Sequence, residues 1–187
     1  MPRSSYTVTV GEEGAGSMQT SSPVIINAHL IGSGFHAALS GMDLAREYHL
    51  APGAVLFRFI KADVSRSALM GADGPWWLES EHFMKLNHFD LANGLPLSHV
   101  AQSLVSIHAE WPEVNGFVRA QVIRWLKYWK GRGKQVVSSG KKKSRAKLAQ
   151  TGSGPEVSQV FIPGIGGVSS LFRTAFTYLD CTSIQSV

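Results

Sequence analysis

The sequence predicts an α+β fold, in which short strands and a few helices share one core. The chain has 187 residues, a length that suits one domain, and 44% of them are hydrophobic, which is ample for a core. Short runs rich in β-branched and aromatic residues lie between turn residues, beside two stretches of helical periodicity, and no internal repeat is visible. We therefore expect a flexible tail over residues 1–22 and a single domain over residues 23–187, with a basic loop at about 131–155.

Several classes of protein are excluded by composition. No window approaches the roughly 18 uninterrupted apolar residues of a membrane span, and residues 1–22 lack the apolar stretch of a secretory signal. The single cysteine, Cys181, rules out an intramolecular disulfide. The seven histidines include no zinc-binding spacing, so no metal site is expected. These features predict a soluble, cytoplasmic protein.

The first part of the chain alternates strand and helix patterns. Residues 23–31 form a compact β-branched run that predicts a buried strand, ended by the turn signal at residues 32–34. Helical spacing then extends over residues 35–50, and Pro52 stops it. Residues 54–61 form a second apolar run and predict a strand.

The second part contains one ambiguous segment. Apolar positions repeat at helical spacing over residues 97–111, which predicts a helix. Residues 117–130 fit either a strand or a helix with a basic face opposite an apolar stripe, and their β-branched and aromatic content favours the strand. Residues 157–163 predict a further strand, and residues 170–179 a closing strand or a short helix.

Positive charge is concentrated in one segment. Eleven of the 18 basic residues lie between Arg119 and Lys147, with no acidic residue among them. Such a block attracts polyanions through counterion release, although it is equally typical of a solvated surface loop. The candidate target-binding residues are Lys130, Arg132, Lys134, Lys141, Lys142 and Lys143.

Arg58 is the first candidate for a ligand contact, because it interrupts an otherwise apolar strand. A buried cation needs a partner, and the planar guanidinium suits a carboxylate or a phosphate. The alternative is an arginine at the rim of a strand, paired with one of the chain's acids.

The segment Trp76-Trp77-Leu78-Glu79-Ser80-Glu81 is the second candidate. Two adjacent tryptophans can form the wall of a pocket that stacks a planar ring, with Ser80 beside it. Alternatively, one tryptophan packs in the core, the other covers an edge, and Ser80 caps a helix over residues 81–89.

Gln159 and Glu156 are the third candidate. Gln159 lies within the predicted strand 157–163, and Glu156 precedes it by three positions. The alternative is that Gln159 points to solvent and that Glu156 is an ordinary loop acid.

The order of these pieces resembles the bacterial ADP-ribosyltransferase toxins, especially small effector and toxin–antitoxin types. The pieces are a strand with an arginine (Val55-Leu56-Phe57-Arg58), then Gly74-Pro75-Trp76-Trp77-Leu78, then a strand running into Lys130–Lys134, then Gln159–Gly164. The resemblance covers roughly residues 54–165 and implies a split β-sandwich, with a few flanking helices, that binds NAD.

The resemblance also implies roles for individual residues. Arg58 would contact the phosphate or ribose of NAD, and Trp76, Trp77 and Ser80 would support the nicotinamide pocket. Gln159 would contact the nicotinamide ribose, but it stands where many members of the family have glutamate, and the family's Ser-Thr-Ser pattern is absent. A glutamine brings no charge, so Glu156 or another acid such as Glu81 would have to supply it.

The function that the resemblance implies is transfer of ADP-ribose from NAD to an acidic protein or a nucleic acid docked on the basic stretch. A neutralising antitoxin or immunity protein and delivery into the cytoplasm of a target cell are implied with it. The rival interpretations are a non-enzymatic nucleic-acid-binding protein that uses residues 119–147, and an interaction module without a cleft. The structure of residues 117–130 discriminates between the first two: an exposed helix favours the nucleic-acid binder, and an inner strand flanking Arg58 favours the transferase.

Overall fold

The first helix and strand differ from the predicted ones. The computed structural model describes residues 22–61, 73–105, 114–133, 154–166 and 171–184. A 3₁₀ turn, η1 (Ala28–Leu30), leads into helix α1 (Ile31–Gly41), which is followed by strand β1 (Met42–Leu50). The predicted strand over residues 23–31 is therefore wrong, because no strand forms there. The predicted helix over residues 35–50 is confirmed through Gly41 and wrong beyond it, where β1 begins.

Close packing explains why a glycine-rich segment is helical. A Cβ at Gly34 would lie 2.8 Å from the Cβ of Pro163, and a Cβ at Gly41 would clash with the ring of Trp76. The missing side chains let α1 approach the sheet closely, and this packing outweighs the low helix propensity of glycine. The residues that read as a turn signal, 32–34, are thus part of a helix that covers the sheet.

In the middle of the chain, the predicted strand over residues 54–61 is confirmed. It forms β2 (Val55–Ile60), followed by β3 (Trp76–Glu79), α3 (Ser80–Asn93) and α4 (Leu97–Leu104). The predicted helix over 97–111 is confirmed through Leu104, and residues 106–113 lie outside the described residues.

The ambiguous segment is two strands. Residues 117–130 fall in β4 (Gly116–Val122) and β5 (Leu126–Gly133), so the strand interpretation is confirmed and the break between them was missed. β6 (Ser158–Phe161) lies within the predicted strand 157–163, and residues 170–179 contribute to both a short helix, α6 (Phe172–Ala175), and β7 (Phe176–Ser183).

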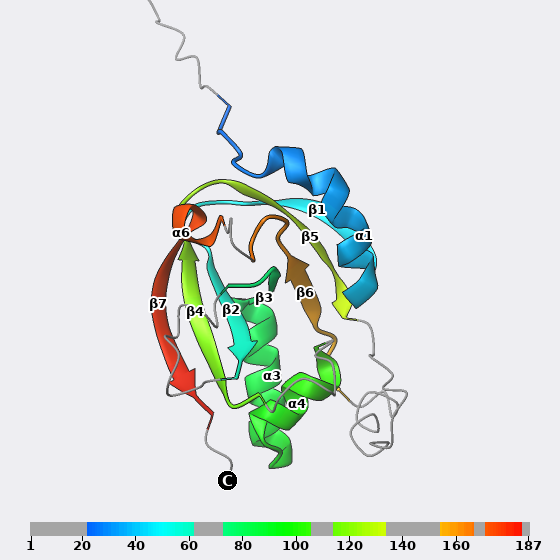
Figure 1. Ribbon diagram of the computed structural model, residues 1–187. Coiled ribbons are helices and arrows are strands. Elements are labelled where there is room, and N and C mark those ends of the chain that lie inside the picture. The colour runs from blue at the N-terminus through cyan, green and yellow to red at the C-terminus, as the bar shows by residue number, and fades with distance from the viewer. Residues whose placement is uncertain (1–21, 62–72, 106–113, 134–153, 167–170, 185–187) are drawn as a thin grey trace, which may run out of the picture.

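All seven strands form one antiparallel sheet in the order β1-β5-β6-β3-β2-β4-β7, which confirms the α+β class. The four-residue strand β3 joins the two halves. Trp76 and Trp77 pair with Phe161 and Val160 of β6, whereas Leu78 and Glu79 pair with β2. Figure 1 shows β2, β4 and β7 side by side, and β1 and β5 on the other side of β3.

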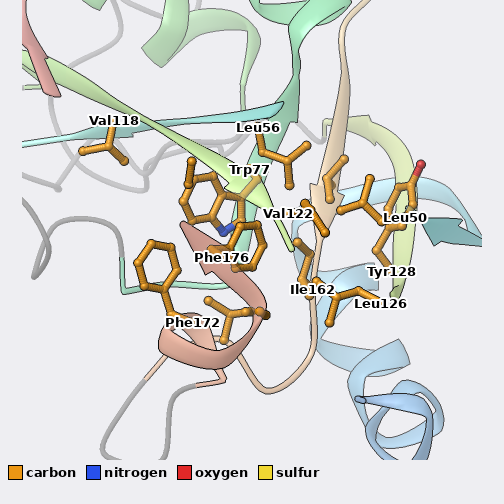
Figure 2. Close-up of a cluster of buried hydrophobic side chains, with 14 of the residues drawn as sticks. Leu50, Leu56, Trp77, Val118, Val122, Leu126, Tyr128, Ile162, Phe172 and Phe176 are labelled. Atoms are coloured by element: carbon orange, nitrogen blue, oxygen red, sulfur yellow. The ribbon is translucent and has the colours of Figure 1, made fainter. Parts of the chain in front are cut away.

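One hydrophobic cluster is shared by both halves of the sheet. Figure 2 shows Leu56, Val118 and Val122 from one half facing Leu126 and Tyr128 from the other. Helices α3 and α4 cover the opposite face of β2 and β4 through a second cluster around Phe57 and Phe83. Helix α1 covers β5 and β6 through a third. The sheet is therefore bent at β3 around a central core (Figure 1).

Asp90, near the end of α3, provides a test of helix electrostatics. Its carboxyl is buried, Oδ1 has no hydrogen-bond partner among the described residues, and burial raises its pKa. A negative charge is also unfavourable at a helix C-terminus. Asp90→Asn is therefore expected to stabilise the fold by about 0.5–1 kcal/mol at neutral pH.

The gain from Asp90→Asn should depend on pH. The pKa of Asp90 is raised in the folded protein, so ionised Asp90 destabilises the fold at pH values above the unfolded pKa of 3.8. Below that pH both the folded and the unfolded protein hold the proton, and the destabilisation is absent. Urea denaturation at pH 7 and at about pH 3 would measure this difference. Equal stability of both proteins at pH 7 would contradict the prediction.

Candidate functional site

Arg58 lies on the inner strand β2, between β3 and β4. Its side chain projects to the same face as Leu56 and Ile60, which belong to the central core. Nη1 donates a hydrogen bond of 2.8 Å to the backbone oxygen of Trp76. Gly74 covers the guanidinium, since a Cβ at Gly74 would clash with it. The structure therefore holds Arg58 at the start of β3.

The charge of Arg58 is retained despite its burial. Burial lowers the pKa of the guanidinium to about 10, and Asp73 opposes this shift. The side chain is therefore protonated at neutral pH and carries a positive charge in a partly desolvated environment. Asp73 acts on the charge of Arg58, but β2 is an inner strand, so Arg58 does not lie on an edge strand of the sheet.

The two tryptophans have different environments. Trp77 is 2% exposed, and its ring lies parallel to those of Phe172 and Phe176 in the central core (Figure 2). Its Nε1 donates a 2.7 Å hydrogen bond to the oxygen of Gly74. Trp76 is partly exposed and meets Phe161 edge to face. One tryptophan thus packs in the core and the other covers an edge, as the simpler alternative stated.

Ser80 opens α3 rather than capping it. Its hydroxyl donates a 3.1 Å hydrogen bond to the oxygen of Val55, and no side chain caps the N-terminus of α3. The helix extends over residues 80–93, four residues beyond the expected 81–89. Ser80 therefore ties the start of α3 to the start of β2.

A second polar group lies at the other end of β3. The carboxylate of Glu79 accepts a hydrogen bond of 2.7 Å from the Tyr128 hydroxyl and one of 2.5 Å from Lys130 Nζ. The Glu79 and Lys130 side chains are 23% and 25% exposed, so both keep contact with solvent. Burial raises the pKa of Tyr128, and Glu79 adds to this, so the phenol stays protonated as a donor. We call these three residues the Glu79 cluster.

His82 lies beside the Glu79 cluster. It is buried, and its Nδ1 accepts a hydrogen bond of 3.3 Å from the backbone N–H of Ser158. Burial lowers its pKa, and the charges of Lys130 and Lys85 lower it further. His82 is therefore neutral at neutral pH, with its ring proton on Nε2.

Gln159 and Arg58 project to opposite faces of the sheet. Val160 belongs to the central core, so its neighbour Gln159 points to the other face, which it shares with Val157 and Phe161. Gln159 is 3% exposed, and its Nε2 has no partner among the described residues. It does not point to solvent, in contrast to the alternative. Glu156 is exposed.

The candidate target-binding residues are only partly described. Lys130 is paired with Glu79, and Arg132 is exposed at the end of β5. Lys134, Lys141, Lys142 and Lys143 lie outside the described residues. Two further basic residues of this stretch are also paired, Arg119 with Asp180 and Lys127 with Glu47. The described strands therefore present no continuous unpaired basic face.

Sequence reasoning missed a pocket of about 470 Å³. Its walls come from η1 and α1, from the turn after β6 and from Leu171. One wall residue, Gly166, approaches Gly74, the residue that covers Arg58. Asn27 fixes two of the segments relative to each other, since its Nδ2 donates to the oxygens of Lys127 and Pro163. The sequence feature that could have indicated this pocket is the glycine-rich segment at residues 164–167.

The described ranges hold no group of three histidine, cysteine, aspartate or glutamate side chains that could bind a metal ion. Among the same residues, none of the helices has the length and apolar character needed to cross a membrane. Burial raises the pKa of the Cys181 thiol, so it is a poor nucleophile at neutral pH.

Comparison with known proteins gives matches at the level of structure alone. No protein-family model and no curated protein sequence matches the chain. The chain is similar to a structure described as Rhs1-CT in complex with cognate immunity protein RhsI1, at 14% identity and a TM-score of 0.43, covering 78% of this chain and 85% of that one. It is also similar to Tse6 in complex with Tsi6, at 13% identity and a TM-score of 0.40, covering 78% and 80%.

Proposed function

We propose that the chain consumes NAD and transfers ADP-ribose to a macromolecular target, as an enzyme of the ADP-ribosyltransferase type. The observation that carries this proposal is the position of Arg58, on an inner strand paired with β3 on one side and β4 on the other. The bent sheet, whose two halves share one core, supports a split-sandwich interpretation.

The rival nucleic-acid-binding function has less support. An exposed helix over residues 117–130 with a free basic face would have favoured it, whereas this segment forms β4 and β5. β4 pairs directly with the strand of Arg58, with Val118 opposite Arg58. Arg119, Lys127 and Lys130 each hold an acidic partner, which leaves them less available for phosphates.

The chemistry of the proposed transfer is a substitution at the nicotinamide ribose. The bond between C1′ and the ring nitrogen breaks with both electrons going to nicotinamide, which leaves neutral, and positive charge develops on the ribose. A lone pair of the target, or of water, forms the new bond at C1′, and its proton passes to solvent. The protein has to hold the phosphates, orient the ribose and stabilise the developing charge.

The residues present fit part of this task. Arg58 is a permanent cation with a planar fork and suits a phosphate or a ribose hydroxyl. Trp76 begins β3 and is partly exposed, and Ser80, the first residue of α3, follows β3 directly and is exposed. Trp77 has its ring in the core, so we assign it a supporting role, through its hydrogen bond to Gly74.

A toxin or effector role, with delivery into a target cell, belongs to the same proposal, and so does a partner protein that neutralises the chain. The chains of Rhs1-CT and Tse6 were each solved with a bound partner. Co-expression of this chain with a candidate partner, compared with expression alone, would test whether the chain is toxic and whether the partner protects.

The decisive test is NAD consumption by the purified chain, with labelled NAD added to a cell lysate in parallel. Release of nicotinamide, with label retained in protein or RNA, would support the transferase and give the class of target. If the purified chain neither consumes nor binds NAD, the proposal is overturned, and nucleic acid should then be titrated across a salt series.

Gly74→Ala tests the role of the Arg58 guanidinium without removing it. The added Cβ would occupy the place of Nη2, and the long arginine side chain can move away. We expect NAD consumption to fall about tenfold, since a displacement near 1 Å disrupts binding geometry, while the melting temperature changes little. Gly32→Ala is the matched control, because a Cβ there meets no atom within 4 Å. Unchanged activity in Gly74→Ala would contradict the assigned role of Arg58.

A further inference from the structure

We propose that Glu79 is the carboxylate that stabilises the developing positive charge in this reaction, an inference that rests on the proposed function. A glycosyl transfer of this kind is helped by a negative group next to the sugar carbon. Gln159 brings no charge, and its side chain is buried on the face of the sheet opposite the central core. The charge therefore has to come from another residue.

The acids near the junction of β3 and α3 differ in how firmly they are held. Glu156 is exposed, in the irregular segment before β6. Glu81 is exposed on α3 and is bonded to Lys85 at 2.6 Å, an ordinary pair one helical turn apart. Glu79 is the last residue of β3, and its backbone pairs with Leu56 of β2. Of these three carboxylates, Glu79 is the one fixed by a strand.

The orientation of the Glu79 carboxylate is set by residues far away in the chain. Tyr128 OH donates to Oε1 and Lys130 Nζ donates to Oε2. Both donors come from β5, which does not pair with β3 directly. A carboxylate offers about four acceptor positions, so each oxygen still accepts a bond from a ribose hydroxyl. Its partial exposure leaves a path for a ligand.

Lys130 and Tyr128 are positioning residues in this proposal. They restrict the rotation of the carboxylate before substrate arrives, which is the condition for electrostatic stabilisation without reorganisation. The simpler alternative is that Glu79 exists to neutralise Lys130, a half-buried cation that would be costly alone. The two roles make different predictions when both charges are removed together.

The experiment compares the wild type with Glu79→Gln, Lys130→Met and the double variant. Nicotinamide release and NAD binding are measured for each, together with the melting temperature. We expect Glu79→Gln to lower kcat by about 100-fold or more and to change the Kd for NAD by less than about threefold. The amide keeps the shape of the side chain and still accepts from Tyr128, so the fold is expected to persist.

The double variant separates a catalytic from a structural role. If Glu79 is catalytic, removing Lys130 as well leaves the protein inactive, because the missing charge is not replaced. If Glu79 only neutralises Lys130, the double variant recovers wild-type activity, which would overturn the inference. Glu47→Gln is the matched control, because Glu47 is a strand glutamate that is also paired with a lysine of β5, Lys127, and has no role in the proposal. It should stay within about twofold of the wild type, since a partly exposed ion pair contributes little.

The failure of this inference is distinguishable from the failure of the proposed function. Wild-type turnover together with an active Glu79→Gln would overturn the role of Glu79 and leave the transferase intact. Loss of activity in Glu156→Gln but not in Glu79→Gln would move the role to Glu156. A wild-type chain that neither binds nor consumes NAD would overturn the function and this role together.

Discussion

Arg58→Met is expected to abolish NAD consumption while the protein remains folded. The substitution removes the buried positive charge that we assign to the phosphate or ribose of NAD, and at least a 100-fold loss in kcat/KM is expected from a lost ligand-binding charge. Methionine keeps an unbranched apolar stem on the core-facing side of β2. The substitution also removes the hydrogen bond to the Trp76 oxygen and the positive charge beside Asp73. We therefore expect the melting temperature to fall by a few degrees while the folded state is retained.

Arg119→Met is the matched control for this experiment. Arg119 lies on β4, next to Val118, which pairs with Arg58, but it projects to the other face and is bonded to Asp180. Its loss should leave NAD consumption within about twofold, because exposed ion pairs contribute little. If Arg58→Met keeps half of the wild-type activity, or if both variants lose activity equally, the role of Arg58 is wrong.

The strand that carries Arg58 was predictable because its sequence pattern fits a strand and no other element. Residues 55–60 are apolar apart from Arg58, they follow a Pro-Gly turn, and both faces of the strand are covered in the structure. The same double coverage explains why the face of each residue could not be predicted. Where both faces are buried, alternation carries no signal, so the opposite orientation of Arg58 and Gln159 was not visible.

The start of the domain could not be predicted from local pattern. Residues 23–31 are rich in β-branched side chains and residues 32–34 look like a turn, yet η1 and α1 form there. The deciding contacts are long-range, since Gly34 meets Pro163 and the Trp129 Nε1 donates to the oxygen of Ile31. Tertiary packing of this kind overrides weak helix propensity.

The Glu79 cluster could not be predicted from local sequence either, because its members are far apart in the chain. Glu79 lies in the tryptophan segment, but its partners are 49 and 51 residues further along the chain. Their sequence positions indicate only a strand with aromatic and basic residues. The pairing depends on β6 lying between β3 and β5, an arrangement that follows from the topology and not from spacing along the chain. Arg58 and Trp76 could be named as candidates from the sequence because each is unusual in its own segment.

Trp77→Ala is expected to cause the largest loss of stability, about 3–5 kcal/mol. Trp77 is among the largest fully buried side chains of the chain, and its ring packs against Phe172 and Phe176, which belong to α6 and β7. The truncation would leave a cavity between the start of β3 and the C-terminal strand, and it would remove the hydrogen bond to Gly74. Urea denaturation at neutral pH would measure the loss of unfolding free energy.

Trp77→Phe separates the packing of this ring from its hydrogen bond. Phenylalanine retains stacking on Phe172 but cannot donate to the Gly74 oxygen, so a smaller loss of about 1–2 kcal/mol is expected. Because Gly74 covers the Arg58 guanidinium, this variant should also weaken NAD consumption more than its stability implies. Trp76→Phe, at the partly exposed edge, is the matched control for stability alone. If Trp77→Ala unfolds at the same urea concentration as the wild type, the ring is not part of the core, and a role as the wall of a ligand pocket would replace it.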